Sequence, residues 1–185
     1  MIDRMPPLQP AQMNDAQKRA AAVLTAGPRK GVFGPFIPLM RSPELMDRMQ
    51  RVGEYLRFNN TIPGKLNEFA ILVTARHVMN QFEWVVHHPL AIKAGVASAT
   101  VDALGQGRRP TGMPQDEALI HDFCTELLST SYVSDATYAR ALAMFGEQGI
   151  VDLVGTVGYF VAICLVMNAA QTPPPASEVS LLKAL

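Results

Sequence analysis

Hydrophobic positions along the chain recur mostly at intervals of three and four residues, and no useful stretch alternates as a strand would. After Ser42, for example, Leu45, Met49, Val52 and Leu56 fall on one face of a helix. Prolines and glycines separate one such stretch from the next. The pattern therefore predicts an all-α protein with about eight helices.

The expected helices share this spacing and are bounded by capping or turn residues. They cover residues 9–26, 43–58, 63–88, 89–95, 98–107, 114–129, 135–145 and 150–170. Ser42, Ser98 and Ser134 are the expected N-caps. The segment 63–88 is either two successive helices or one bent helix, and Pro89 predicts a break directly after it. The apolar loop 27–42 is expected to cover a pocket or an interface.

The segment 150–170 is almost uncharged and about as long as a membrane span. Asp152 and Asn168 lie inside its ends, and no Lys or Arg flanks it to set an orientation. We therefore expect a central core or interface helix and no membrane partner.

Composition bounds the domain count and the class of partner. A chain of 185 residues accommodates one domain, which we place at residues 1–175, followed by a C-terminal tail at 176–185. The end of the chain, 172–185, has consecutive prolines near its start and is expected to form an arm or to be partly disordered. Lys and Arg total 16 and Asp and Glu total 16, and this balance argues against a nucleic-acid partner. The charged fraction of 17% is low for a soluble domain and favours a homo-oligomer.

Cys124 and Cys164 are the two cysteines, and both lie in apolar helical patterns. They form no zinc spacing or disulfide framework, and buried thiols in apolar surroundings are inert. The N-terminal residues are polar and proline-rich, without the apolar region of a secretory signal. These features predict a cytoplasmic protein.

Candidate chemistry gathers on one segment. Along an unbroken helix Arg76, Asn80, Glu83 and His87 fall within a stripe of roughly 60°. Glu83 and His87 are i, i+4 neighbours, and such a pair suits general acid–base catalysis. The same spacing also fits a solvated or purely structural pair. Trp84 could wall a pocket or belong to the core.

His88 is an alternative to His87, and Glu83, Glu68 and the two histidines could in principle hold a metal ion. The sequence has no HExxH motif and no second carboxylate–histidine pair of the di-iron type. It also has no phosphate-binding glycine loop. We therefore expect neither a metal nor another cofactor.

Residues 65–95, KLNEFAILVTARHVMNQFEWVVHHPLAIKAG, resemble the carboxymuconolactone decarboxylase and alkylhydroperoxidase D-like superfamily. In its peroxidase branch an acidic residue precedes a CxxC motif, and a His follows the second Cys by four residues. Glu68 matches the acid, Asn80 and Glu83 stand at the two Cys positions, and His87 matches the His. The form EWxxHxPLAxxAG therefore looks like a member without the redox motif.

The resemblance implies a compact helical domain that assembles as a homo-oligomer, typically a trimer or hexamer. It implies a cofactor-independent lyase-type enzyme acting on a small carboxylated lactone or ring acid. Its catalytic residues would be His87, Glu83 and Glu68. The expected substrate-binding residues are Arg76, Asn80, Trp84, His88 and Arg41.

Two alternatives stay open. One is the peroxidase activity of the alkylhydroperoxidase D branch, for which this chain lacks the dithiol that would reduce a peroxide. The other is a non-catalytic binding or assembly protein, in which Glu83 and His87 form a buried structural pair.

Overall fold

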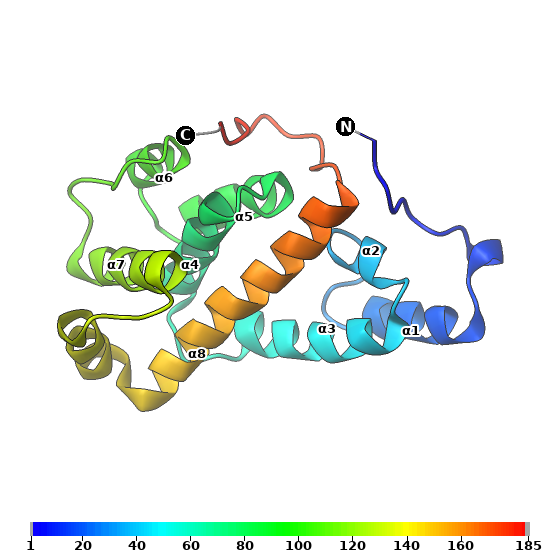
Figure 1. The fold of residues 1–185 in the computed structure, drawn as a ribbon, viewed down its shortest axis with the longest axis horizontal. Helices are drawn as coiled ribbons and strands as arrows, with labels where there is room; N and C mark the ends of the chain where they lie inside the picture. Colours follow the sequence, from blue (N-terminus) through cyan, green and yellow to red (C-terminus); the bar gives the residue numbers. More distant parts are fainter. Residues whose placement is uncertain (1, 184–185) are drawn as a thin grey trace.

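The computed structural model describes residues 2–183, and within them it contains helices and no strands (Figure 1). The all-α prediction is confirmed. The helices are η1 (Pro10–Gln12), α1 (Asp15–Ala26), α2 (Phe36–Leu39), α3 (Pro43–Phe58), α4 (Gly64–His77), α5 (Gln81–Lys93), α6 (Ser98–Gly105), α7 (Gln115–Thr130) and α8 (Asp135–Ala170).

Helix α8 crosses the middle of the molecule and separates two groups of helices (Figure 1). Helices α1 to α3 lie on one side of it, and α4 to α7 lie on the other. Phe69, Phe123 and Leu153 are buried in the larger core, which α4, α7 and α8 share. Leu24 and Met46 belong to a smaller core among α1, α2 and α3. The molecule therefore has two packed halves joined through α8.

The apolar segment near the C-terminus forms the second part of α8. Gly146 interrupts the helix with φ 65° and ψ 179°, a conformation that favours glycine. It lies between the two predicted helices 135–145 and 150–170, as expected of a residue that separates them. Ser134 caps the first turn and accepts a hydrogen bond from the Thr137 amide at 3.3 Å. Helix α8 is long and apolar enough to cross a membrane, but 56% of its most apolar window is buried inside this fold. Leu153, Phe160 and their neighbours thus make it a core helix.

The predicted break after His88 is wrong. Helix α5 continues through Pro89 to Lys93, and the chain breaks earlier, between α4 and α5. Met79 has a left-handed backbone with φ 54°, and Asn80 then caps α5. A proline inside a helix costs about 3 kcal/mol. Burial of Val85 and Ala91 on both sides of Pro89 offsets that cost.

Three smaller expectations also need correction. Ala97 occupies the N-cap position of α6, and Ser98 is its first helical residue. The expected loop 27–42 contains the short helix α2. The tail, expected as an arm or as partly disordered, packs on α5 as far as it is described. Gln81 exchanges two 2.8 Å hydrogen bonds with the backbone of Leu182. Residues 184–185 of the tail lie outside the described residues.

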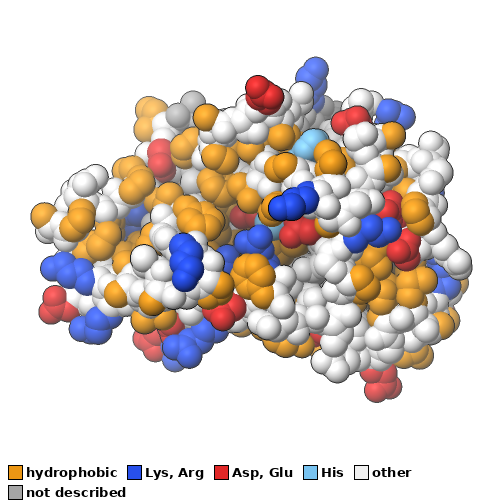
Figure 2. Space-filling view, turned by 180° about the vertical axis from the view of Figure 1, so that it is seen from behind, with side chains coloured by type: hydrophobic (Ala, Val, Ile, Leu, Met, Phe, Trp, Pro, Cys, Tyr) orange, Lys and Arg blue, Asp and Glu red, His pale blue; other side chains and the backbone are white. Residues whose placement is uncertain are grey.

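Apolar side chains are scattered among charged ones on the outer surface, as Figure 2 shows for one face. Several of the exposed apolar side chains belong to α8, including Val151 at 67% and Leu165 at 52% exposure. The homo-oligomer, the cytoplasmic location and the domain boundary at residue 175 stay predictions.

Candidate acid–base site

His87 lies in the middle of α5 and is only 1% exposed. Its Nδ1 atom is 2.6 Å from Oε2 of Glu68 on α4. Its Nε2 atom is 3.1 Å from Oε2 of Glu83, one turn earlier on α5. The imidazole and the ring of Phe160 on α8 pack nearly perpendicular to each other, with 5.3 Å between centroids. One imidazole is thus held between two carboxylates.

This environment decides the protonation of the imidazole. Burial by itself lowers the pKa of His87, because it penalises the charged form. The hydrogen bonds and negative charges of Glu68 and Glu83 outweigh burial and hold the pKa of His87 above its ordinary 6.5. A protonated imidazole donates to both carboxylates at once. Glu68 and Glu83 therefore keep a proton on His87 in the protein interior.

Asn80 sets the start of α5 and so the position of Glu83. Its Oδ1 atom accepts a hydrogen bond from the Glu83 amide at 2.8 Å. Its amide nitrogen donates to Oδ1 of Asn168 at 2.8 Å and to the carbonyl of Cys164 at 3.2 Å. Because these bonds occupy the side chain, Asn80 holds α5 against α8. Asn80 does not line the cavity beside His87, and its expected contact with substrate stays a prediction.

A narrow cavity of about 20 Å³ opens beside the imidazole, with room for roughly one water molecule. Glu83 and His87 form one wall. Tyr159 and Phe160 of α8 form another. Phe33 and its neighbours from the segment before α3 cover the cavity. The expected loop does therefore lie over a pocket.

Three side chains at this cavity carry four hydrogen-bond donor atoms that have no acceptor among the described residues. They are Nε and Nη2 of Arg29, Nε of Arg57 and the hydroxyl of Tyr159. Burial raises the pKa of Tyr159 to about 12, so the phenol stays neutral and able to donate. The Arg29 guanidinium lies over the Phe36 ring, 4.7 Å from its centroid. Two cations and a phenol thus face the Glu83–His87 pair across the cavity.

Sequence reasoning missed Arg29, Arg57 and Tyr159. They come from the α1–α2 connection, α3 and α8, and no spacing along the chain relates them. The available signal was the apolar loop 27–42, which contains Arg29 and was expected to cover a pocket.

The predicted stripe of four residues is wrong for Arg76, because the chain breaks between α4 and α5. Arg76, Trp84 and His88 line a different cavity of about 740 Å³ under the C-terminal segment. The Trp84 indole donates to the carbonyl of Ser180 there at 3.1 Å. The expected role of these residues beside His87 therefore does not fit their placement.

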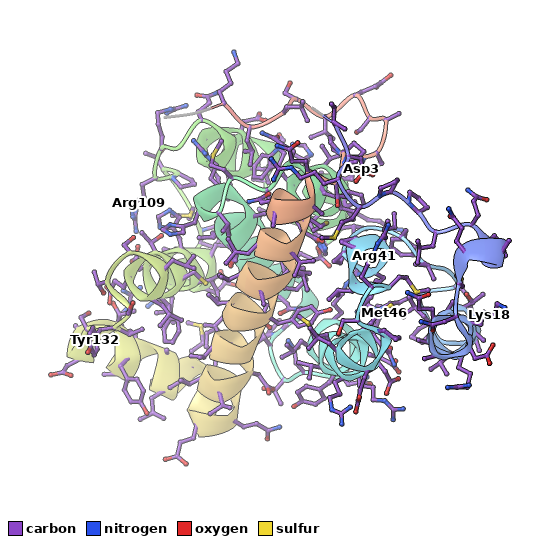
Figure 3. All side chains as sticks on the ribbon, turned by 45° about the vertical axis from the view of Figure 1, so that its right-hand side comes forward. Asp3, Lys18, Arg41, Met46, Arg109 and Tyr132 are labelled. Carbon is purple, nitrogen blue, oxygen red and sulfur yellow. The ribbon has the colours of Figure 1, made fainter. Side chains whose placement is uncertain are left out.

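Arg41 follows α2, on the α1–α3 side of the molecule (Figure 3). Its guanidinium donates to the carbonyls of Ile37 at 2.9 Å and Pro6 at 2.6 Å. It does not line the cavity at His87. Its bonds tie the N-terminal segment to α2, and its expected contact with substrate stays a prediction.

Both cysteines are free and buried. Burial raises the pKa of Cys124 to about 12, and burial and the charge of Glu83 raise the pKa of Cys164. Their thiols therefore stay protonated at neutral pH. Within residues 2–183, no group of three or more His, Cys, Asp or Glu side chains is arranged to hold a metal ion.

No protein-family model matches the sequence, and no curated protein sequence matches it. Among solved structures, the chain is similar to an uncharacterized peroxidase-related protein with an alkylhydroperoxidase AhpD core, from Ralstonia eutropha JMP134. The TM-score is 0.74 at 15% sequence identity, over 94% of this chain and 93% of that one. The predicted fold is thereby confirmed: this chain has the alkylhydroperoxidase D-like fold.

Proposed function

We propose that the protein is a cofactor-independent acid–base enzyme of the lyase type, acting on a small carboxylated lactone or ring acid. One observation carries the proposal: an imidazole held by two carboxylates faces two guanidinium groups and a phenol that lack acceptors. This arrangement joins a proton donor to a receptor for an anion.

His87 and Glu83 would move the proton. Both ring nitrogens of His87 are bonded to carboxylates, so the proton passes to the substrate through Glu83, which shares the cavity wall. Glu68 holds the far side of the ring and keeps the imidazole charged. When the bond to the leaving carboxyl group breaks, its electron pair stays on the ring carbon and carbon dioxide departs. The proton from the pair then neutralises that carbon.

Arg29, Arg57 and Tyr159 would hold the substrate. A guanidinium binds a carboxylate through two parallel hydrogen bonds, and both arginines have nitrogen atoms without partners. The Tyr159 hydroxyl would donate to a carbonyl oxygen that gains negative charge as the carboxyl group leaves. The 20 Å³ cavity is smaller than any such ring, so the covering segment with Phe33 would move aside to admit substrate.

The cysteines of this chain do not support thiol peroxidase chemistry. A peroxide is reduced by a thiolate, and burial keeps the thiols of Cys124 and Cys164 protonated. The neighbouring structure is described as peroxidase-related, and its 15% identity carries a fold and no activity.

The test is a turnover screen of the full chain with small carboxylated lactones, muconic-type diacids and hydroperoxides. We expect carbon dioxide release from one acid class. His87→Gln and Glu83→Gln should each lower kcat by about 10²-fold or more. Arg29→Gln should raise KM by about tenfold or more, because it removes an anion contact.

The control is a Cys124→Ala, Cys164→Ala double variant, which should keep full turnover. Turnover of hydroperoxides alone, lost in that double variant, would overturn the proposal. Unchanged kcat in His87→Gln would overturn it as well. Loss of the folded state in both Glu83→Gln and His87→Gln, without any substrate found, would favour the structural pair and a binding or assembly role.

A further inference from the structure

A third cavity, of about 670 Å³, lies between the C-terminal end of α4, the α6–α7 connection and α7. Its apolar lining includes Val73, Leu104 and Leu128. It shares no lining residue with the cavity beside His87, and it shares Arg76 alone with the 740 Å³ cavity under the C-terminal segment. Its volume is in the range of ligand pockets, about 300–1,000 Å³. The proposed function makes no use of this cavity.

Arg76 lies in the wall of this cavity and is only 6% exposed. Its Nε and Nη2 atoms have no partner among the described residues, and its Nη1 atom meets only the thioether sulfur of Met79. A thioether is a weak acceptor, and a buried cation is costly without a negative partner. The guanidinium therefore lacks the anion that such a position requires.

The other charged groups around the cavity are basic. Arg108 and Arg109 line it, and within residues 2–183 no Asp or Glu does. Arg108 donates to Gln106 and Arg109 to Asp122, at 2.6 Å and 2.9 Å for their Nη2 atoms. Figure 3 shows Arg109 on the α7 side of the molecule, away from Arg41. Among these three arginines, Arg76 is the one whose guanidinium lacks an oxygen acceptor.

We propose that this cavity binds an amphipathic organic anion. Its carboxylate pairs with Arg76, and its hydrocarbon body lies on Val73, Leu104 and Leu128. The inference combines an unpaired buried cation, a basic rim and an apolar wall in one cavity of sufficient size. It is independent of the chemistry at His87.

Calorimetric titration of the full chain with octanoate tests the proposal. We expect saturable binding, and binding at least tenfold weaker for 1-octanol, which lacks the charge, and for acetate, which lacks the hydrocarbon body. Arg76→Met should weaken octanoate binding at least tenfold. This variant removes an unpaired buried charge, so we expect it to fold.

Thr125→Trp is a second variant, at an exposed residue of α7 whose enlarged side chain would fill the cavity. It should also weaken octanoate binding at least tenfold, and it decides the question if Arg76→Met fails to fold. Arg29→Gln, in the other cavity, should bind octanoate as the wild type does.

Three results would overturn the proposal. The first is absence of saturable binding, or equal binding to Arg76→Met and the wild type. The second is loss of binding in Arg29→Gln alone, which would place octanoate beside His87. The third is absence of octanoate binding together with a Thr125→Trp variant that sediments as a smaller species than the wild type. That result would show that this face forms contacts between copies of the chain.

Discussion

At the scale of single residues, the protonation of His87 depends on two opposing effects. Burial disfavours the imidazolium, whereas Glu68 and Glu83 favour it and prevail. Glu68 contacts Nδ1 of His87 from another helix. Replacing Glu68 should therefore lower the pKa of His87 in part, while Glu83 stays in place. The pair on α5 and its partner on α4 can therefore be tested separately.

We predict that the His87 imidazole titrates above pH 6.5 in the wild type and at lower pH in Glu68→Gln. The imidazole resonances in an NMR pH titration report this directly. His88, whose pKa burial lowers, serves as the internal reference and should titrate below 6.5 in both proteins. A wild-type His87 that titrates at or below 6.5 would contradict the prediction.

The same shift has a consequence for stability. The folded-state pKa of His87 is raised, so its contribution is fully present below the unfolded value near 6.5. That contribution is lost as the pH rises through the folded-state pKa. The free energy of unfolding should therefore fall over this interval in the wild type, and fall less in Glu68→Gln. Denaturant unfolding at a series of pH values measures both slopes.

Gly53 on α3 leaves room for the Arg29 and Tyr159 side chains at the proposed anion-binding side of the cavity. A Cβ atom at this position would overlap the Tyr159 hydroxyl and come within 2.8 Å of Nη2 of Arg29. We predict that Gly53→Ala costs about 1–3 kcal/mol of stability through overpacking and weakens substrate binding. Gly64→Ala is the matched control, since a Cβ there meets nothing within 4 Å. Equal stability of the two variants would count against this account.

At the scale of elements, the interruption between α4 and α5 determines which side chains reach His87. Met79 takes a left-handed conformation, and Asn80 then starts a new helix with Glu83 in its first turn. The turn separates Arg76 from Glu83, and each then lines a different cavity. The start of α5 is therefore a positioning element for the acid–base pair.

We predict that Asn80→Ala lowers the free energy of unfolding by about 2 kcal/mol, because it removes an N-cap and a contact with α8. Asn80→Ser retains an acceptor for the Glu83 amide and should lose less. Denaturant unfolding compares the three proteins. Wild-type stability of Asn80→Ala would show that the cap does not hold α5.

At the scale of the whole molecule, α8 lies between the two halves of the fold (Figure 1). Its residue Asp152 makes polar contacts with α3 and with the α3–α4 connection. Asp152 accepts hydrogen bonds from the amide and hydroxyl of Thr61 at 2.9 Å and 2.8 Å. It also accepts one from the hydroxyl of Tyr55 on α3 at 3.0 Å. Burial alone would raise the pKa of Asp152, but these donors outweigh it and hold the pKa below its ordinary 3.8.

We predict that Asp152→Asn destabilises the protein by about 1–3 kcal/mol at neutral pH, because the charged acceptor of three donors is lost. The folded-state pKa is depressed, so this contribution is present above about pH 3.8 and is lost as the pH falls through the folded-state pKa. The difference in free energy of unfolding between Asp152→Asn and the wild type should therefore decrease over that acidic interval.

Asp47→Asn is the control, because Asp47 pairs with Arg51 at the surface and exposed pairs contribute little. Chemical unfolding at neutral and acidic pH measures both variants. An Asp152→Asn effect no larger than that of Asp47→Asn would contradict the predicted role.

The sequence by itself determined the helical class, most of the helix bounds and the Glu83–His87 pair. These features depend on short-range spacing, which a helix converts directly into a shared face. It also indicated Glu68 through the family resemblance, and the fold that the resemblance implies is confirmed. The capping serine at 134 and the separating glycine at 146 are likewise local signals.

Only the tertiary structure decided what surrounds the pair. Arg29, Arg57 and Tyr159 converge from distant parts of the chain, because α3 and the segment after α1 pack against α8. Pro89 lies inside α5 because burial of side chains on both sides of it, such as Val85 and Ala91, outweighs a local preference. Arg76 does not share a helix face with Glu83 and His87, because the left-handed backbone of Met79 interrupts the helix between them. Long-range packing has no fixed spacing along a chain, and these contacts follow from it.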